Sequence, residues 1–369
     1  MIAKRQVRSL IYTALLSTAL MAGASVPESV LAQTLGSIRP ADEPLRLKSR
    51  GSFMVGGDVV RQTPQQLSSI FDKPPSDGGD IVVNQMYVEY MVPETVSGLA
   101  IVMLHGATLT GKTYDTTPDG RMGWYEFFVR RGHPTYVPDQ VSRGRSGVDL
   151  SIYNDVRSGT KSVSDLPNVF RISSQLGWTM FRFGPSYGTP FADGQFPTAE
   201  AAELSRQAVP DLNAVLPTPN PNAKAMAELA AQLRGAILLG HSETGALPLE
   251  AALTDRRGIR GLILVEPGSC NSAGWSDDDI AVFSKFPIAA VFGDHLDAPT
   301  GTPGFSWQDA FEDCQAFVAR VRAAGGNAQM LHLPAMGFHG NSHMMMMDRN
   351  NIEIADLLLK WIDHDVEGN

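Results

Sequence analysis

The stretch 235–250, GAILLGHSETGALPLE, decides the fold, because an apolar strand is followed there by a sharp turn and an apolar helical pattern. A continuous apolar run of this kind is typical of a strand that is covered on both faces. A strand-to-helix turn lifts the Ser242 side chain above the sheet edge and puts the backbone N–H of Glu243 at a helix N-terminus. Ser242 is therefore a candidate nucleophile, although Thr244 stands where the common G-x-S-x-G pattern has its second glycine.

Other segments of the chain repeat this strand-and-helix pattern. Continuous apolar runs occupy 98–106, 133–139, 261–268 and 288–294, with a last strand expected at 328–334. Helical patterns lie between or after them, at 124–132, 224–235, 246–258, 307–326 and 351–362. Such alternation predicts an α/β protein with a mostly parallel, doubly wound sheet. Earlier in the chain, alternating apolar residues at 51–60 and 80–92 predict two antiparallel strands with one exposed face.

The connection from Asp139 to Gly235 is too long for an ordinary turn between a strand and a helix. Loops of this length inside a domain are usually lids or binding segments. We therefore expect a cap-like insertion at about 145–220, over the edge where the parallel strands end.

The N-terminus has the features of a secretory signal peptide over residues 1–32. Three basic residues precede an apolar run, and small-residue cleavage sites follow at Ala24 and Ala32. The run is shorter than the ~20 apolar residues that a membrane anchor needs. We expect an exported protein, periplasmic or secreted, with a poorly ordered leader at 33–50 and the α/β domain at 51–369.

Charge and cysteine content narrow the partners further. The net charge is −9, and removal of the basic leader would make the chain more acidic still. Neither nucleic acid nor an anionic membrane surface is then an expected partner. No membrane span is predicted, and a homodimer stays possible. Export to an oxidising compartment favours a disulfide between the only two cysteines, Cys270 and Cys314.

Polar side chains gather directly after the predicted strands, where open parallel sheets bind their ligands. A serine needs a base to take its proton, and His339 and His343 both follow the last strand. The base in turn needs an orienting carboxylate. These residues alone do not rank the three acids that follow the neighbouring strands: Glu266, Asp294 and Asp297.

Two backbone N–H groups are candidates for an oxyanion hole, the pair of donors that binds the negative oxygen of a carbonyl group under attack. One belongs to Glu243, directly after the serine. The other belongs to Ala107, in the sequence LHGATLTG after an earlier strand, where Gly106 permits close approach.

Several longer strings resemble a small family of secreted bacterial esterases with the α/β-hydrolase fold: DGRMGWYEFFVRRG, DQVSRGRSG, FRFGP, PTPNPN, VEPGSC, FGDH and HGNSHMMM. The resemblance covers about residues 50–365. In that family the acid is the glutamate of V-E-P-G and the base is the histidine after Gly-Asn-Ser. The resemblance thus implies a triad of Ser242, Glu266 and His343. From the residues alone, His339 stays open as an alternative base and Asp297 as an alternative acid.

The cysteines of this chain differ from those of the family at one place and agree with them at another. The family has two adjacent cysteines after its His-Gly pair, where this chain has Ala107 and Thr108. The backbone donors can survive this change, whereas any effect of the family's vicinal disulfide cannot be transferred. The cysteines that match Cys270 and Cys314 are retained, which supports their pairing and suggests that the bridge ties the loop after Glu266 to a flanking helix.

The sequence therefore predicts a secreted carboxylic ester hydrolase that needs no metal or organic cofactor. A lactonase, an amidase or a carbon–carbon bond hydrolase can use the same triad. In a different class, His339, His343 and the methionines at 344–347 resemble soft ligands for copper in an exported protein. A non-catalytic binding module would require the loss of a triad member, and none is missing.

Overall fold

The computed structural model describes residues 33–69, 73, 76–212 and 216–368. The expected signal peptide at 1–32 lies outside these residues. Within the described ranges, no helix combines the length and the apolar character that crossing a bilayer demands.

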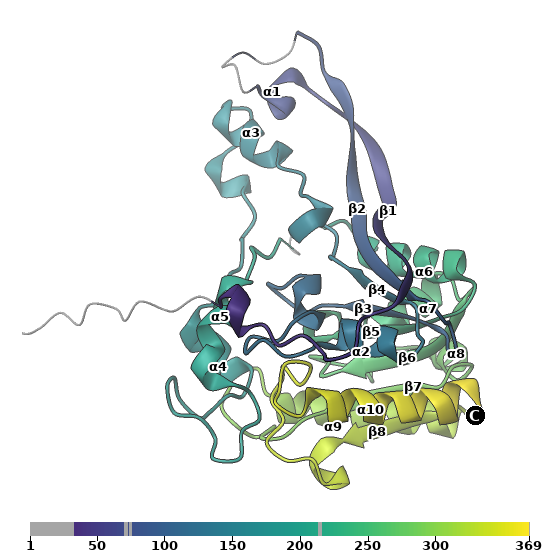
Figure 1. Ribbon diagram of the computed structural model, residues 1–369. Coiled ribbons are helices and arrows are strands. Elements are labelled where there is room, and N and C mark those ends of the chain that lie inside the picture. Colours follow the sequence, from purple (N-terminus) through teal and green to yellow (C-terminus); the bar gives the residue numbers. More distant parts are fainter. Residues whose placement is uncertain (1–32, 70–72, 74–75, 213–215, 369) are drawn as a thin grey trace, which may run out of the picture. The chain divides into compact units, whose positions relative to one another are not determined.

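A single sheet of eight strands organises the described chain (Figure 1). The strands are β1 (Leu47–Gln62), β2 (Gly79–Pro93), β3 (Ala100–Leu104), β4 (Thr135–Pro138), β5 (Ala236–His241), β6 (Ile259–Val265), β7 (Ile288–Phe292) and β8 (Ala328–His332). Their order is β1-β2-β4-β3-β5-β6-β7-β8, with β2 antiparallel to both neighbours and all other pairs parallel. This confirms the predicted mostly parallel sheet, including the antiparallel start.

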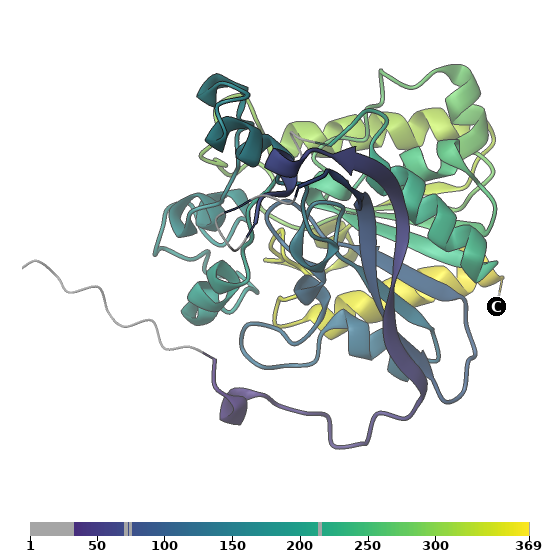
Figure 2. The same cartoon turned by 90° about the horizontal axis from the view of Figure 1, so that it is seen from above.

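Two apolar cores form because successive side chains of a strand point to opposite faces. Val102 and Leu104 face one core, whereas Ile101 and Met103 face the other. Helices α6 (Pro221–Leu233), α7 (Leu247–Thr254), α8 (Asp277–Phe283) and α9 (Trp307–Ala323) pack on the first face. The second face is covered by α2 (Trp124–Arg130) and α10 (Asn351–Trp361), and Figure 2 shows α10 in yellow on the side opposite the green helices.

The long connection between β4 and β5 carries several short helices before it reaches α6. They are α3 (Ser151–Arg157), α4 (Ser174–Met180) and α5 (Ala201–Arg206). Helix α3 lies beside α1 (Pro64–Leu67) at the far end of the β1–β2 hairpin (Figure 1), where Gln66 donates to the Asp155 carboxylate over 3.1 Å. The connection therefore contacts the hairpin as well as the strand ends described below.

The expected leader at 33–50 extends too far into the chain. Strand β1 begins at Leu47, and its first residues pair with the end of β2 through Leu47–Pro93 and Arg50–Met91. Nearer the start, the Gln33 side chain donates to the carbonyl oxygens at 117 and 118. The prediction missed the start of this strand because the residues at 48–50 are polar and exposed, and therefore show no apolar alternation.

Candidate active site

Ser242 occupies a sharp turn between β5 and α7. Its φ is +60°, a conformation that non-glycine residues rarely adopt, and a 3₁₀ turn over Ser242–Thr244 follows. The Thr244 hydroxyl accepts the N–H of His241 and donates to the carbonyl of His105 over 2.9 Å. A Cβ atom on Gly240 would lie 2.0 Å from the Thr244 carbonyl oxygen, so the turn requires a glycine there. Strain at a single polar residue of this kind is typical of functional sites.

The loop after β3 lies directly against this turn. A Cβ atom on Gly106 would lie 2.6 Å from the Cβ of Ser242, so only glycine allows this approach. His105 is buried beside it, and its Nε2 accepts the backbone N–H of Gln140 over 3.0 Å. Burial lowers the pKa of His105 to about 4. His105 is therefore neutral and fixes the loop that leads into Ala107.

A buried arginine links the two loops that carry the expected oxyanion donors. Arg143 forms ion pairs with the carboxylates of Asp211 and Glu243, the latter over 3.2 Å. Asp211 in turn accepts the backbone N–H of Thr108 over 3.1 Å. Thr108 follows Ala107, so the network connects both candidate donors. Sequence reasoning missed Arg143, whose role is visible only once distant segments are brought together.

Glu266 and His343 form a buried pair at the ends of neighbouring segments. The distance from Glu266 Oε2 to His343 Nδ1 is 3.1 Å, and both side chains are inaccessible to solvent. The other carboxylate oxygen, Oε1, accepts from Arg182 Nη2 over 2.6 Å and from the N–H of Gly293 over 2.5 Å. Oε1 thus accepts two hydrogen bonds that fix the orientation of the carboxylate, and Oε2 faces the histidine.

The charges of this pair follow from their surroundings. Burial alone would raise the pKa of Glu266, but the Arg182 guanidinium and His343 outweigh burial and hold this pKa at about 2. Burial lowers the pKa of His343, and the hydrogen bond that His343 donates to the Glu266 carboxylate offsets this lowering only in part. At neutral pH the acid is therefore ionised and the imidazole is neutral.

The His343 ring is held by three other rings. Trp307 and His241 lie with ring centroids at 4.1 and 4.6 Å, and Phe181 stacks at 5.5 Å. His343 Nε2 is buried and has no hydrogen-bond partner among the described residues. Because Nδ1 faces the Glu266 carboxylate, the proton belongs on Nδ1 and the Nε2 lone pair is available as a base.

The alternative base and acids have other partners or are exposed. His339 is 64 % exposed, and its Nδ1 lies 3.7 Å from Asp294 Oδ2. Asp294 accepts the backbone N–H groups of His295 and Gly340, while Asp297 is exposed. Partners and exposure thus distinguish candidates that were equivalent in sequence.

The side chains of the alternative copper-binding hypothesis have other surroundings. The side chains of Met344 to Met347 are fully buried in the core beneath α2 and α10. His343 is engaged by Glu266, and His339 is largely exposed. These methionines fill the core, as runs of methionine often do.

The predicted disulfide is confirmed, since Cys270 and Cys314 are bonded. Cys314 belongs to α9, and Cys270 lies in the loop after β6 that begins with Glu266. Asp313 reinforces the link by accepting the N–H of Cys270 over 2.7 Å. The loop after Glu266 is therefore fixed to a flanking helix, as expected.

Comparison with known proteins gives relatives that cover most of the chain. A solved structure described as a novel bacterial esterase is 44 % identical with a TM-score of 0.81, and the match covers 89 % of this chain and 98 % of that one. A probable secreted lipase, phiG, from a fungal species (strain ATCC 74256) is 27 % identical over 352 residues, which are 80 % of this chain and 93 % of the relative. No family model matches the chain.

Proposed function

The chain belongs to the esterases of the α/β-hydrolase fold, and we propose that it cleaves carboxylic esters by two-step acyl transfer through Ser242. The observation that carries this proposal is the buried Glu266–His343 pair, 3.1 Å apart, with His343 Nε2 left unpartnered. The strained turn at Ser242 follows β5, the strand that pairs with the Glu266 strand, β6.

In the first step, His343 Nε2 takes the hydroxyl proton of Ser242 while Oγ bonds to the ester carbonyl carbon. The carbonyl oxygen becomes negative and accepts hydrogen bonds from the backbone N–H groups of Ala107 and Glu243. The bond from this carbon to the alcohol oxygen then breaks, and His343 returns the proton to the departing alcohol. An acyl group remains on Ser242.

In the second step, water replaces the alcohol and follows the same route. His343 removes a proton from the water, whose oxygen attacks the acyl carbon, and the serine oxygen leaves with that proton. Glu266 stays ionised throughout, because its pKa lies at about 2, and stabilises the imidazolium that forms twice in the cycle.

The insertion between β4 and α6 acts as a cap in this proposal, because it contributes groups at the triad. The Phe181 carbonyl accepts the N–H of His343 over 3.0 Å, and Arg182 pairs with Glu266. Substitutions in the insertion should therefore change both acyl selectivity and the orientation of the triad.

Export through the leader at 1–32 is also part of the proposal. The disulfide Cys270–Cys314 supports it, since such bonds persist in oxidising compartments, and the fungal relative is called a secreted lipase. N-terminal sequencing of protein recovered outside the cytoplasm tests this. Mature chains that begin after Ala24 or Ala32 are expected, and an intact N-terminus would contradict export by cleavage.

Hydrolysis of short- and medium-chain p-nitrophenyl esters, measured with a metal chelator present, tests the mechanism. Wild-type protein should be active, and Ser242→Ala and His343→Ala should lose almost all activity while staying folded. His339→Ala is the matched control, because this exposed histidine should be dispensable. Full activity in folded Ser242→Ala would refute the proposed nucleophile.

A further inference from the structure

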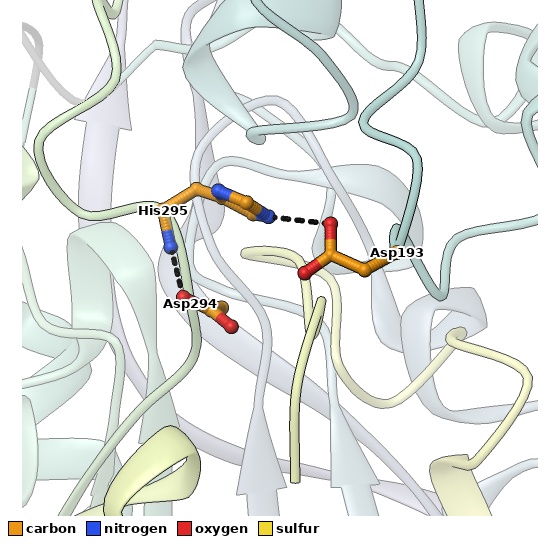
Figure 3. Close-up of side chains that lie close together, drawn as sticks. All are labelled: Asp193, Asp294 and His295. Carbon is orange, nitrogen blue, oxygen red and sulfur yellow. Dashed lines mark hydrogen bonds and ion pairs between the residues drawn. The ribbon is translucent and has the colours of Figure 1, made fainter.

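A second cluster of chemically active side chains lies apart from the triad. Asp193, Asp294 and His295 place one ligand atom each so that all three atoms lie within 4.8 Å of one another. Figure 3 shows the His295 ring directed at the Asp193 carboxylate, and Nε2 lies 2.9 Å from Oδ1. Two carboxylates bring two negative charges here, of which one imidazole can offset at most one.

The cluster joins segments that are far apart in the sequence. Asp193 belongs to the insertion, whereas Asp294 and His295 follow β7. Phe191 stacks on the His295 ring at 3.8 Å with an angle of 7° between the planes, so the imidazole is held in one orientation. A preorganised ring of this kind lowers the entropy cost of binding an ion.

We propose that Asp193, Asp294 and His295 form a binding site for a divalent transition-metal ion such as Zn²⁺. Imidazole nitrogen and carboxylate oxygen are donors that Zn²⁺ takes at ~2.0–2.2 Å, which puts neighbouring donors about 3.3–3.6 Å apart in a tetrahedron. The observed spacing needs only small side-chain adjustments to reach this geometry. Ca²⁺ fits less well, because it takes six to eight oxygen ligands.

A fourth donor is available at the solvent side. His339 Nδ1 lies 3.7 Å from Asp294 Oδ2, and its largely exposed side chain can turn toward the ion. Water can occupy the same position, since Asp193 is itself about half exposed. Both carboxylate oxygens of Asp294 accept backbone N–H groups, but each retains a second lone pair for a metal.

The ion would fasten the insertion to the loop that leads to the catalytic histidine. Gly340 donates its N–H to Asp294, and its carbonyl accepts the N–H of Gln195 over 2.8 Å. The Asp294 carbonyl also accepts from Arg182 Nε over 2.7 Å. The proposed role is therefore to stabilise this junction, with no part in the steps of ester cleavage.

Titration of the metal-free purified enzyme with Zn²⁺ in a calorimeter tests the site, and Co²⁺ absorption spectra report the ligands independently. We expect one ion per chain, and a melting temperature about 5 °C higher when zinc exceeds Kd 100-fold. His295→Gln and Asp193→Asn should each weaken binding at least about 100-fold, because even indirect ligand contacts contribute 10- to 100-fold. Both side chains are partly exposed, so these variants should fold.

His364→Gln is the matched control. His364 forms a similar pair with Asp365 over 3.2 Å, but among the described residues no third ligand joins it. This variant should bind zinc as the wild type does. Absence of zinc binding by the wild type would overturn the proposal, as would binding that His295→Gln and Asp193→Asn leave unchanged.

Discussion

Replacement of Arg182 by methionine removes one charge from the buried pair that orients the triad acid. Arg182 Nη2 and Glu266 Oε1 are 2.6 Å apart, and neither side chain reaches solvent. Removal of one partner from such a pair typically costs ~3–5 kcal/mol, because the other charge stays buried. A pKa of Glu266 at about 2 instead of 4.5 corresponds to ~3 kcal/mol, which is of the same size. This is a net value: burial raises the pKa, and Arg182 and His343 together lower it by more.

The expected loss depends on pH in a defined direction. Because the pKa of Glu266 is depressed in the folded state, its contribution is fully present above about pH 4.5 and is lost as pH falls toward 2. Arg182→Met lacks much of this contribution. The difference in unfolding free energy between wild type and variant should therefore be largest at neutral pH and should shrink below pH 4.5.

Urea unfolding followed by tryptophan fluorescence, at pH 7 and at pH 3, measures this difference. Arg257→Met is the matched control, because Arg257 pairs with Asp255 over 2.7 Å but is 82 % exposed, and solvent screens that pair. Its stability should hardly change at either pH. Unaltered stability of Arg182→Met at pH 7, or the same loss at pH 7 and pH 3, would refute the electrostatic reasoning.

Three further predictions concern catalysis. Glu266→Gln should lower kcat on the order of 10³- to 10⁴-fold in folded protein, and Asp297→Asn should change kcat little. The reverse ranking would place the triad acid in the loop after β7. Gly106→Ala should abolish most activity, since its Cβ would lie 2.6 Å from that of Ser242, and near-normal kcat/KM would contradict this packing. The fall of kcat/KM at acidic pH should have its midpoint below pH 6.5, because burial lowers the pKa of His343. A midpoint above pH 6.5 would contradict the lowered pKa.

Much of the fold could be predicted from sequence, because strands buried on both faces appear as continuous apolar runs. β3, β4, β5 and β7 fall inside runs identified in this way, and β6 begins two residues before its run. Helix α8 was missed, since only Ile280 and Phe283 of this short helix are buried. The capping box formed by Ser276 and Asp279 was the available signal for it.

The candidate site could be predicted less completely. The turn at Ser242 has a local signature, but Glu266, Asp294 and Asp297 all follow strands and differ only in what reaches them through space. Arg182 has no local signature, since an arginine among aromatic residues is ordinarily a surface residue. It is buried because two acceptors, the Glu266 carboxylate and the Asp294 carbonyl, compensate for its desolvation.

The central claim is that Ser242 carries the acyl group, and covalent trapping tests it most directly. A fluorophosphonate probe should lose fluoride to a nucleophilic serine oxygen, leaving a stable oxygen–phosphorus bond. Peptide mass spectrometry of the inactivated enzyme should locate one adduct, on Ser242. The fraction of activity lost should equal the fraction of chains that carry the adduct. Complete inactivation with the adduct on another residue, or full labelling of Ser242 with activity retained, would contradict the account.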